Sequence, residues 1–139
     1  MAVWTRDELN KIGAAEELEI ASLRSDGTLR KPVTIWVVRL GDDLYVRSMN
    51  GTTGSWYRGA LTRHEGHIEA GGVDKNVDFV EVAEPKVNDQ IDAVFRTKYH
   101  RYGTRIVGTI VTNQARAATL KLVPRGSDSN LLVENRTGE

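Results

Sequence analysis

The segment of residues 47–61, RSMNGTTGSWYRGAL, combines residue types from which an anion pocket can be built. Arg47 and Arg58 carry guanidinium groups, which donate paired hydrogen bonds to phosphate or carboxylate oxygens. A predicted strand ends where the segment begins and a predicted helix starts within it, and the N-terminal amides of a helix attract negative charge. The polar residues that would complete the pocket are Ser48, Asn50 and Ser55. The sequence therefore predicts an anion-binding loop, with solvated surface arginines and an ordinary chain turn as the alternative.

Two further groups of charged residues accompany this loop. Residues 30–32, RKP, place two more cations at the mouth of a predicted strand, or form a solvated charge run. Lys98 and Tyr99 come at the end of a predicted helix, where the helix dipole favours cations. The functional alternative is that both side chains project into a pocket across a subunit boundary.

The three histidines do not form a recognisable metal motif. HEGH, residues 64–67, is one residue shorter than H-E-x-x-H, the pattern that places two imidazoles on one helix face. Two imidazoles without a third nearby ligand make a poor metal site. We therefore expect no metal.

Composition excludes several classes of protein. The 139 residues contain 19 basic and 19 acidic side chains and no cysteine, so neither a long-range charge field nor thiolate chemistry is expected. No apolar run approaches the roughly 20 residues of a membrane helix, and the N-terminus lacks a signal-peptide pattern. Phosphate-loop and G-x-S-x-G signatures are absent. We expect a cytoplasmic protein that binds a small molecule, and neither nucleic acid nor a membrane.

The elements that must position these residues follow from periodicity and end signals. A helix over residues 4–13 begins with a capping box, and a second helix over residues 55–66 uses Ser55 as its cap. Apolar residues at helical spacing predict a third helix over residues 87–103. Strands are predicted over residues 17–25, 32–40, 44–48, 67–72, 77–85 and 115–125.

Short strands with hairpin-like spacing, interrupted by few helices, predict a mainly β fold: a small antiparallel barrel with helices outside it. We assign residues 1–125 to this single domain. Residues 126–139 are polar and are expected to form a flexible tail.

Four segments of the chain resemble a known family: residues 30–61, GHIEAGG, KYHRYG and ATLKLVPR. They are similar to the bacterial family called domain of unknown function 2255, and the resemblance extends to Arg125. That family is similar to the flavin-binding split barrels, which include the pyridoxamine-phosphate oxidases and the deazaflavin-dependent nitroreductases. The lysine-rich phosphate signatures of the flavin mononucleotide oxidases are not recognisable here.

The resemblance implies a six-stranded split β-barrel and a homodimer with cofactor pockets at the subunit boundary. It also implies flavin mononucleotide or a deazaflavin coenzyme as cofactor. In the deazaflavin branch, a strand with a basic or polar end precedes a loop and a tryptophan-containing helix near the cofactor phosphate. This layout matches Arg47, Ser48, Trp56, Tyr57 and Arg58.

The leading hypothesis is a flavin- or deazaflavin-dependent oxidoreductase that acts on a small organic substrate. Arginines would hold the cofactor phosphate, aromatic residues would pack near the ring, and Tyr57 or His67 would donate a proton. The expected cofactor-binding residues are Arg47, Ser48, Asn50, Ser55, Trp56, Arg58, Trp36, Lys98 and Tyr99, and the expected catalytic residues are Tyr57, Arg58 and His67.

Two alternatives belong to other functional classes. A cofactor-free split-barrel enzyme, a lyase, isomerase or cyclase, would use Tyr57, Arg58 or His67 as an acid or anion clamp. A small-ligand-binding protein without catalysis would need the pocket alone.

Overall fold

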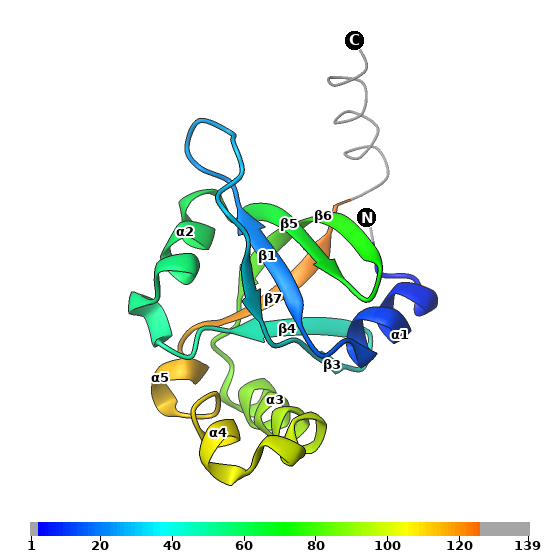
Figure 1. The fold of residues 1–139 in the computed structure, drawn as a ribbon. Helices are drawn as coiled ribbons and strands as arrows, with labels where there is room; N and C mark the ends of the chain where they lie inside the picture. Colours follow the sequence, from blue (N-terminus) through cyan, green and yellow to red (C-terminus); the bar gives the residue numbers. More distant parts are fainter. Residues whose placement is uncertain (1–2, 126–139) are drawn as a thin grey trace.

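Seven antiparallel strands form one curled sheet in the computed structural model, which describes residues 3–125. Their order is β2-β1-β5-β6-β7-β4-β3, and the sheet curls into a barrel (Figure 1). The strands are β1 (Leu18–Ser22), β2 (Val33–Ile35), β3 (Val38–Leu40), β4 (Asp43–Arg47), β5 (Glu65–Ala70), β6 (Val73–Glu81) and β7 (Thr119–Pro124). The predicted mainly β barrel is confirmed, and the predicted tail over residues 126–139 lies outside the described residues.

The barrel closes through a strand that breaks in its middle. β2 pairs with β1 at one edge of the sheet and β3 pairs with β4 at the other edge, although only Trp36 and Val37 separate them in the chain. The sequence predicted one strand over residues 32–40, and the bend between the two edges makes it two. This bend explains why the structure has seven strands where six were expected.

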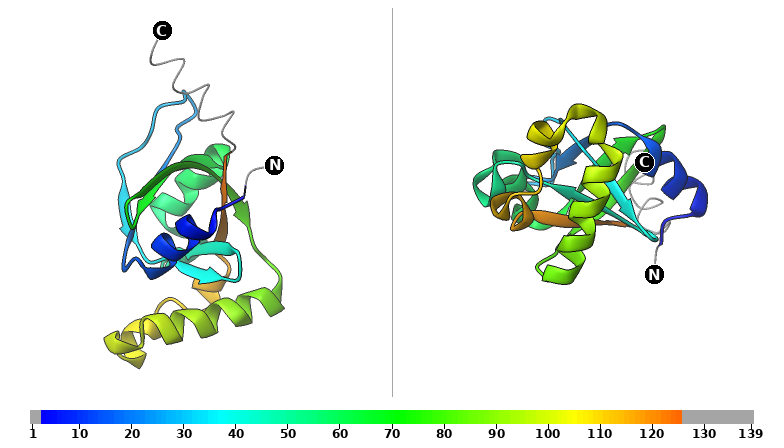
Figure 2. Two further views of the ribbon diagram at one scale, coloured as in Figure 1. Left: turned by 90° about the vertical axis from the view of Figure 1, so that its right-hand side faces the viewer. Right: turned by 90° about the horizontal axis from the view of Figure 1, so that it is seen from below.

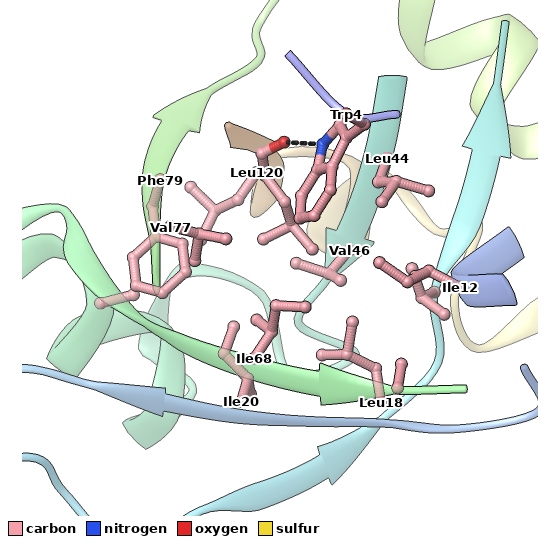
Figure 3. Close-up of a cluster of buried hydrophobic side chains, with 14 of the residues drawn as sticks. Trp4, Ile12, Leu18, Ile20, Leu44, Val46, Ile68, Val77, Phe79 and Leu120 are labelled. Atoms are coloured by element: carbon pink, nitrogen blue, oxygen red, sulfur yellow. Dashed lines mark hydrogen bonds between the residues drawn. The ribbon is translucent and has the colours of Figure 1, made fainter. Parts of the chain in front are cut away.

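Apolar side chains at alternate strand positions fill the barrel. Because successive strand residues point to opposite faces, pairs such as Leu18 and Ile20 of β1 both point inward (Figure 3). Trp4 is buried with this cluster, and its Nε1 donates a hydrogen bond of 2.9 Å to the carbonyl of Leu122. The other inward residues in Figure 3 include Ile12, Leu44, Val46, Ile68, Val77, Phe79 and Leu120. The core therefore lies inside the barrel and leaves its outer surface to polar groups and helices.

Five helices and two 3-10 turns surround the barrel in the described part of the chain. They are α1 (Arg6–Ala14), η1 (Gly51–Thr53), α2 (Ser55–Arg63), α3 (Pro85–Lys98), η2 (His100–Tyr102), α4 (Thr104–Gly108) and α5 (Asn113–Arg116). The predicted capping box of α1 is present, since Thr5 Oγ1 accepts from the Glu8 amide and Glu8 Oε1 accepts from the Thr5 amide. None of the helices within residues 3–125 has the length and apolarity needed to cross a membrane.

The helices α3, α4 and α5 gather beyond one end of the barrel (Figures 1 and 2). Of these helices, α3 and α4 form a second apolar cluster with the outer face of β3 and β4, distinct from the barrel core. Its buried members are Val38, Tyr45, Ile91, Phe95, Tyr99, Val107 and Ile110. The molecule thus has two packed regions, one inside the barrel and one under α3.

The helix boundaries differ from the predicted ones for local reasons. The cap of α2 is Gly54 and not Ser55, because the extended backbone before the helix ends at Gly54 and Ser55 is already helical. A Cβ at Gly54 would lie 2.4 Å from Ser48 Oγ, which favours glycine at this cap. The same helix ends at Arg63, since His64 takes a left-handed φ of 56° and Glu65 starts β5. The predicted third helix ends at Lys98, and the chain continues as η2, α4 and α5, which the sequence did not predict.

Candidate functional site

A pocket with three basic side chains lies between α2 and the strand pair β1 and β2. Its volume is about 240 Å³. It is lined by Ile20, Ser22, Arg24, Arg30, Lys31, Val33, Ser55 and Trp56. We call it the Arg30 pocket, because Arg30 is the residue whose position distinguishes it.

Arg30 has a buried donor without a protein partner. Its Nε is the one buried side-chain nitrogen or oxygen within residues 3–125 that lacks a hydrogen bond. Its Nη2 donates a long hydrogen bond, 3.4 Å, to Thr62 Oγ1 on α2. Since an unpaired buried N–H costs about 1–3 kcal/mol, a ligand oxygen at this point would offset a cost that the protein alone carries.

One face of α2 lets the Arg30 side chain approach closely. Ser55, Gly59 and Thr62 lie at helical spacing and share this face. A Cβ at Gly59 would lie 2.8 Å from Arg30 Nε and 3.1 Å from Ser22 Oγ, so the Arg30 side chain can take this position only beside a glycine. Ser55 is the first residue of this nine-residue helix, which places the positive end of the helix dipole at the pocket.

The other two cations come from the turn between β1 and β2. Arg24 Nη1 donates to Thr28 Oγ1 at 3.2 Å and to the Leu29 carbonyl at 2.9 Å, which fixes its guanidinium over the turn. Lys31 is exposed. Asp26 lies in the same turn, where hydrogen bonds from Thr28 lower its pKa. The one carboxylate of the turn, Asp26, accepts hydrogen bonds from Thr28. The basic side chains that line the pocket outnumber it, so the local charge is positive.

Apolar side chains form the remaining wall of the Arg30 pocket. Ile20 and Val33 face each other across the β1 and β2 pair, and Val33 is 37% exposed. Trp56 is half-buried and packs edge-on against Tyr57, with ring centroids 6.1 Å apart. The pocket thus joins a basic side to an apolar and aromatic side, which suits an anionic ligand with a flat apolar part.

Arg47 is the opposite case, because the protein uses all its donors. The side chain is buried, with 2% exposure of the residue. Its Nε donates to Thr119 Oγ1 at 2.9 Å, and its Nη1 donates to Asp92 Oδ1 at 2.5 Å. Nη1 also donates to the Ile110 carbonyl, and Nη2 donates to both the carbonyl and Oδ1 of Asn88. A guanidinium has five N–H donors, so none remains for an anion.

The surrounding network assigns Arg47 a structural role in place of the predicted phosphate contact. Asp92 Oδ2 also accepts from Arg116 Nη1 at 2.6 Å, and the same Nη1 donates to Asp89 at 2.8 Å. Burial lowers the pKa of Arg47 while Asp92 opposes this shift, and bonds to Asp89 and Asp92 raise the pKa of Arg116. The network joins β4 to α3 and α5, and so connects the two packed regions.

The predicted anion-binding loop, residues 47–61, contributes to both the Arg47 network and the Arg30 pocket. Ser48 is buried beside Gly54, and the carbonyl of Asn50 accepts from Gln114 Nε2 of α5 at 2.7 Å. Gly51, with a φ of 71°, lies so close to Gln114 that a Cβ would be 2.3 Å from its Cγ. Ser48 and Asn50 therefore connect the barrel to α5, whereas Ser55 and Trp56 line the Arg30 pocket.

The predicted catalytic residues do not come together. Tyr57 is buried in the barrel core, and burial raises its pKa. Arg58 is exposed on α2. His67 lies on the outer face of β5, where Nδ1 is 2.7 Å from Asn76 Oδ1 and Nε2 contacts Asp74. None of the three lines the Arg30 pocket.

Trp36, Lys98 and Tyr99 meet at the strand break instead. The Trp36 and Tyr99 rings stack with centroids 4.0 Å apart and an angle of 5°. The Tyr99 hydroxyl donates to Glu16 and Val37 carbonyls and accepts from the Val37 amide, and burial raises the pKa of Tyr99. None of the three lines the Arg30 pocket, so the predicted cofactor residues divide into separate regions.

The cations that do line the pocket had a weak sequence signal. Arg30 and Lys31 stood out only as a charged pair before a strand, and Arg24 carried no signal at all. A turn reverses the chain, so the residues on either side of SDG become neighbours; the Arg30 amide donates to the Ser22 carbonyl at 2.8 Å. The cluster could have been predicted from the basic residues on the two sides of that turn, Arg24 before it and Arg30 and Lys31 after it.

The chain belongs to a bacterial protein family. The model of the family DUF2255, described as uncharacterized protein conserved in bacteria, matches residues 8–122. This confirms the resemblance seen in the sequence. No curated protein matches the chain.

Several solved structures share its fold. The heme storage protein HutZ from Vibrio cholerae has 12% identity and a TM-score of 0.59, over 87% of this chain and 90% of that chain. A FAD-binding protein from Mesorhizobium loti has 14% identity and a TM-score of 0.52, over 90% of this chain and 93% of that one. The FAD and heme binding protein from Mycobacterium smegmatis has 18% identity and a TM-score of 0.50, over 93% and 78%. At these identities the similarity shows the split-barrel fold.

Proposed function

We propose that this member of the DUF2255 family binds a flavin- or deazaflavin-type cofactor at the Arg30 pocket. We further propose that it acts as an oxidoreductase on a small organic substrate. The observation that carries the proposal is the unpaired, buried Nε of Arg30 beside two other cations and the start of α2. The names of the solved relatives, two of which bind FAD, support the same class of ligand.

Different residues of the pocket would bind different parts of the cofactor. Arg30, Arg24 and Lys31 supply the positive charge that a phosphate needs, and Arg30 Nε supplies an unpaired donor that a small movement of its side chain would bring to the ligand. Ser55 adds a hydroxyl at the start of α2. Trp56 and Val33 provide the surface against which a ring packs. The bound cofactor would supply the hydride chemistry, and the protein would orient it and exclude water.

A second copy of the chain would complete the site. The pocket volume of about 240 Å³ is below the roughly 300–1,000 Å³ of ordinary ligand pockets, so it holds only part of a flavin. Leu29 and Val33, beside the opening, are 48% and 37% exposed. We propose a homodimer in which the partner covers these residues and the outer part of the ring.

Heme fits this pocket less well than a flavin does. The lining residues include no histidine, cysteine, methionine or tyrosine, so they offer no side chain of the kinds that ligate heme iron. The basic side chains would accept heme propionates as readily as a phosphate. The choice of flavin over heme therefore rests on the missing iron ligand.

The small volume also favours a second candidate function. A cofactor-free enzyme, a lyase, isomerase or cyclase, or a small-ligand-binding protein would use the same pocket for a compact anion such as a phosphorylated or carboxylated metabolite. Such a ligand fits within about 240 Å³ without a partner. Arg58, which is exposed on α2, stays a candidate anion clamp in either case.

Titration of the purified protein with flavin mononucleotide and with a deazaflavin coenzyme tests the proposal, with quenching of tryptophan fluorescence as the signal. We expect micromolar binding. Arg30→Ala should weaken it ten- to a hundredfold, because a charged hydrogen bond contributes about 1.5–3 kcal/mol. Native mass would report whether two copies share the ligand.

Arg105→Ala is the matched control, since Arg105 is an exposed arginine on α4, outside the pocket lining. It should bind as the unaltered protein does. Absence of binding to both cofactors at micromolar concentration would overturn the flavin proposal, whereas binding that Arg30→Ala leaves unchanged would place the cofactor elsewhere. Binding of inorganic phosphate alone would favour the cofactor-free alternative.

A further inference from the structure

A second hollow, of about 330 Å³, lies between α1, β3 and α3 and contains two basic side chains. It is lined by Gly13, Arg39, Ala93, Val94, Thr97 and Lys98. It shares no lining residue with the Arg30 pocket. We call it the Lys98 hollow.

The Lys98 amine is held in this hollow without a carboxylate partner. Its Nζ donates to the Val37 carbonyl at 2.6 Å and lies 5.1 Å from the centre of the Tyr99 ring. Glu16 acts on it through charge alone, because the Glu16 carboxylate is bonded by Arg101 at 2.7 Å and by Tyr102. Among the ion pairs of residues 3–125, none includes Lys98.

This setting makes the neutral amine accessible. Burial lowers the pKa of Lys98 to about 8, and Glu16 only partly opposes the shift. The neutral amine keeps two N–H groups, so it can still donate to Val37 while its lone pair is free. A lysine amine of lowered basicity is a nucleophile for carbonyl carbon.

Arg39 fixes a cation on the wall of the same hollow. Its Nε donates to the Gly41 carbonyl at 2.8 Å and its Nη1 donates to Asn10 Oδ1 at 2.8 Å. These two bonds hold the guanidinium and leave Nη2 without a protein partner among the described residues. A Cβ at Gly13 would already be 3.2 Å from Arg39 Cδ, so α1 packs directly on this side chain.

We propose that the Lys98 hollow is a second ligand site, in which the Lys98 amine condenses with an aldehyde or ketone that carries a carboxylate or phosphate group. The nitrogen lone pair forms a bond to the carbonyl carbon. The two N–H protons of the amine pass to the carbonyl oxygen, which leaves as water, and this gives a C=N imine without oxidation or reduction. Arg39 holds the anionic group through its free Nη2. The proposal is independent of the cofactor at the Arg30 pocket.

Reductive trapping tests the proposal on the full chain. The protein is treated at about pH 7.5 with glyoxylate and cyanoborohydride, and the labelled lysines are mapped by peptide mass spectrometry. Lys98 should be labelled at least about tenfold faster than Lys86, because burial favours the neutral form of the Lys98 amine, which is the form that attacks the aldehyde. Lys86 is exposed and lies on the same helix, so it is the internal reference.

Variants separate the two parts of the proposal. Lys98→Arg should remove the fast label while Lys86→Arg preserves it. Arg39→Gln should slow labelling by glyoxylate several-fold and leave labelling by acetaldehyde, which has no anionic group, unchanged. A Lys98 rate no higher than that of Lys86 in the unaltered protein would overturn the nucleophile, and equal slowing of both aldehydes in Arg39→Gln would overturn the anion site.

Discussion

Arg47 ends a barrel strand and Arg30 lies in the connection between two others, and the protein treats the two arginines in opposite ways. Arg47 is the last residue of β4 and donates all its hydrogen bonds to the protein. Arg30 precedes β2 and keeps a buried Nε without a partner. A buried polar group costs stability when it is unpaired and contributes stability when it is paired. Arg47 therefore stabilises the fold, whereas the unpaired Nε of Arg30 destabilises the ligand-free protein.

The difference shows where stability and binding are separated in this fold. The Arg47 network joins the barrel to α3 and α5, and a ligand would have to displace protein partners to enter it. The Arg30 pocket has donors available and an open apolar side. Substitutions at the first should therefore change the free energy of unfolding, and those at the second should change ligand affinity.

Arg47→Met should have the largest effect. It leaves Asp92 buried with only Arg116 as a partner and removes the hydrogen bonds that Asn88, Thr119 and Ile110 accept from Arg47. We expect a loss of about 3–5 kcal/mol in the free energy of unfolding, measured by urea denaturation. Arg105→Met, an exposed control, should change it by less than about 0.5 kcal/mol. Equal effects of the two variants would contradict the structural role of the network.

Gly59→Ala should reverse this pattern by weakening binding without weakening the fold. The added Cβ would lie 2.8 Å from Arg30 Nε, so the guanidinium must move away from the pocket. We expect roughly tenfold weaker flavin binding, and stability that is unchanged or raised by up to about 1 kcal/mol, because alanine favours a helix over glycine. Gly108→Ala, where a Cβ meets nothing within 4 Å, is the control. A loss of stability in Gly59→Ala without a loss of affinity would contradict this assignment.

The same substitution, arginine to methionine, should lower the free energy of unfolding at Arg47 but not at Arg30. Arg30→Met removes a buried donor that has no partner and keeps much of the apolar stem. We expect the free energy of unfolding to stay unchanged or to rise by about 1 kcal/mol in the ligand-free protein. Urea denaturation without and with flavin mononucleotide measures it, since added ligand should stabilise the unaltered protein more than the variant. Marked destabilisation of the ligand-free variant would show that Arg30 is structural.

The sequence could predict the barrel but could not distinguish these two arginines. Alternating residues such as Leu18 and Ile20 determine which face of a strand is inside, and the capping box of α1 is local in the chain, so both were predictable. The partners of Arg47 come from residues 88, 92, 110 and 119, and no local pattern predicts that they meet. Ser55 and Trp56 were expected at a ligand site and line the Arg30 pocket. The sequence could not show that Arg30 joins them, because this depends on how α2 packs against the turn after β1.

The smallest effect concerns the pH dependence of stability at Lys98. Burial lowers the pKa of Lys98 to about 8, below its value near 10.4 in an unfolded chain. Between these two pH values the unfolded chain binds more protons at this site than the folded chain does. Raising the pH through this window therefore removes the cost of burying a charged amine, and stability should rise.

Lys98→Arg isolates this contribution, because arginine stays charged across the window and other titrating groups are shared by both proteins. The difference in urea midpoint between the unaltered protein and the variant should increase from about pH 8 to about pH 10, the range set by the two pKa values. A difference that stays flat would mean that Lys98 titrates as a solvated lysine. That outcome would also weaken the nucleophile proposed for the Lys98 hollow, while leaving the comparison of Arg30 with Arg47 intact, because that comparison depends on hydrogen bonds alone.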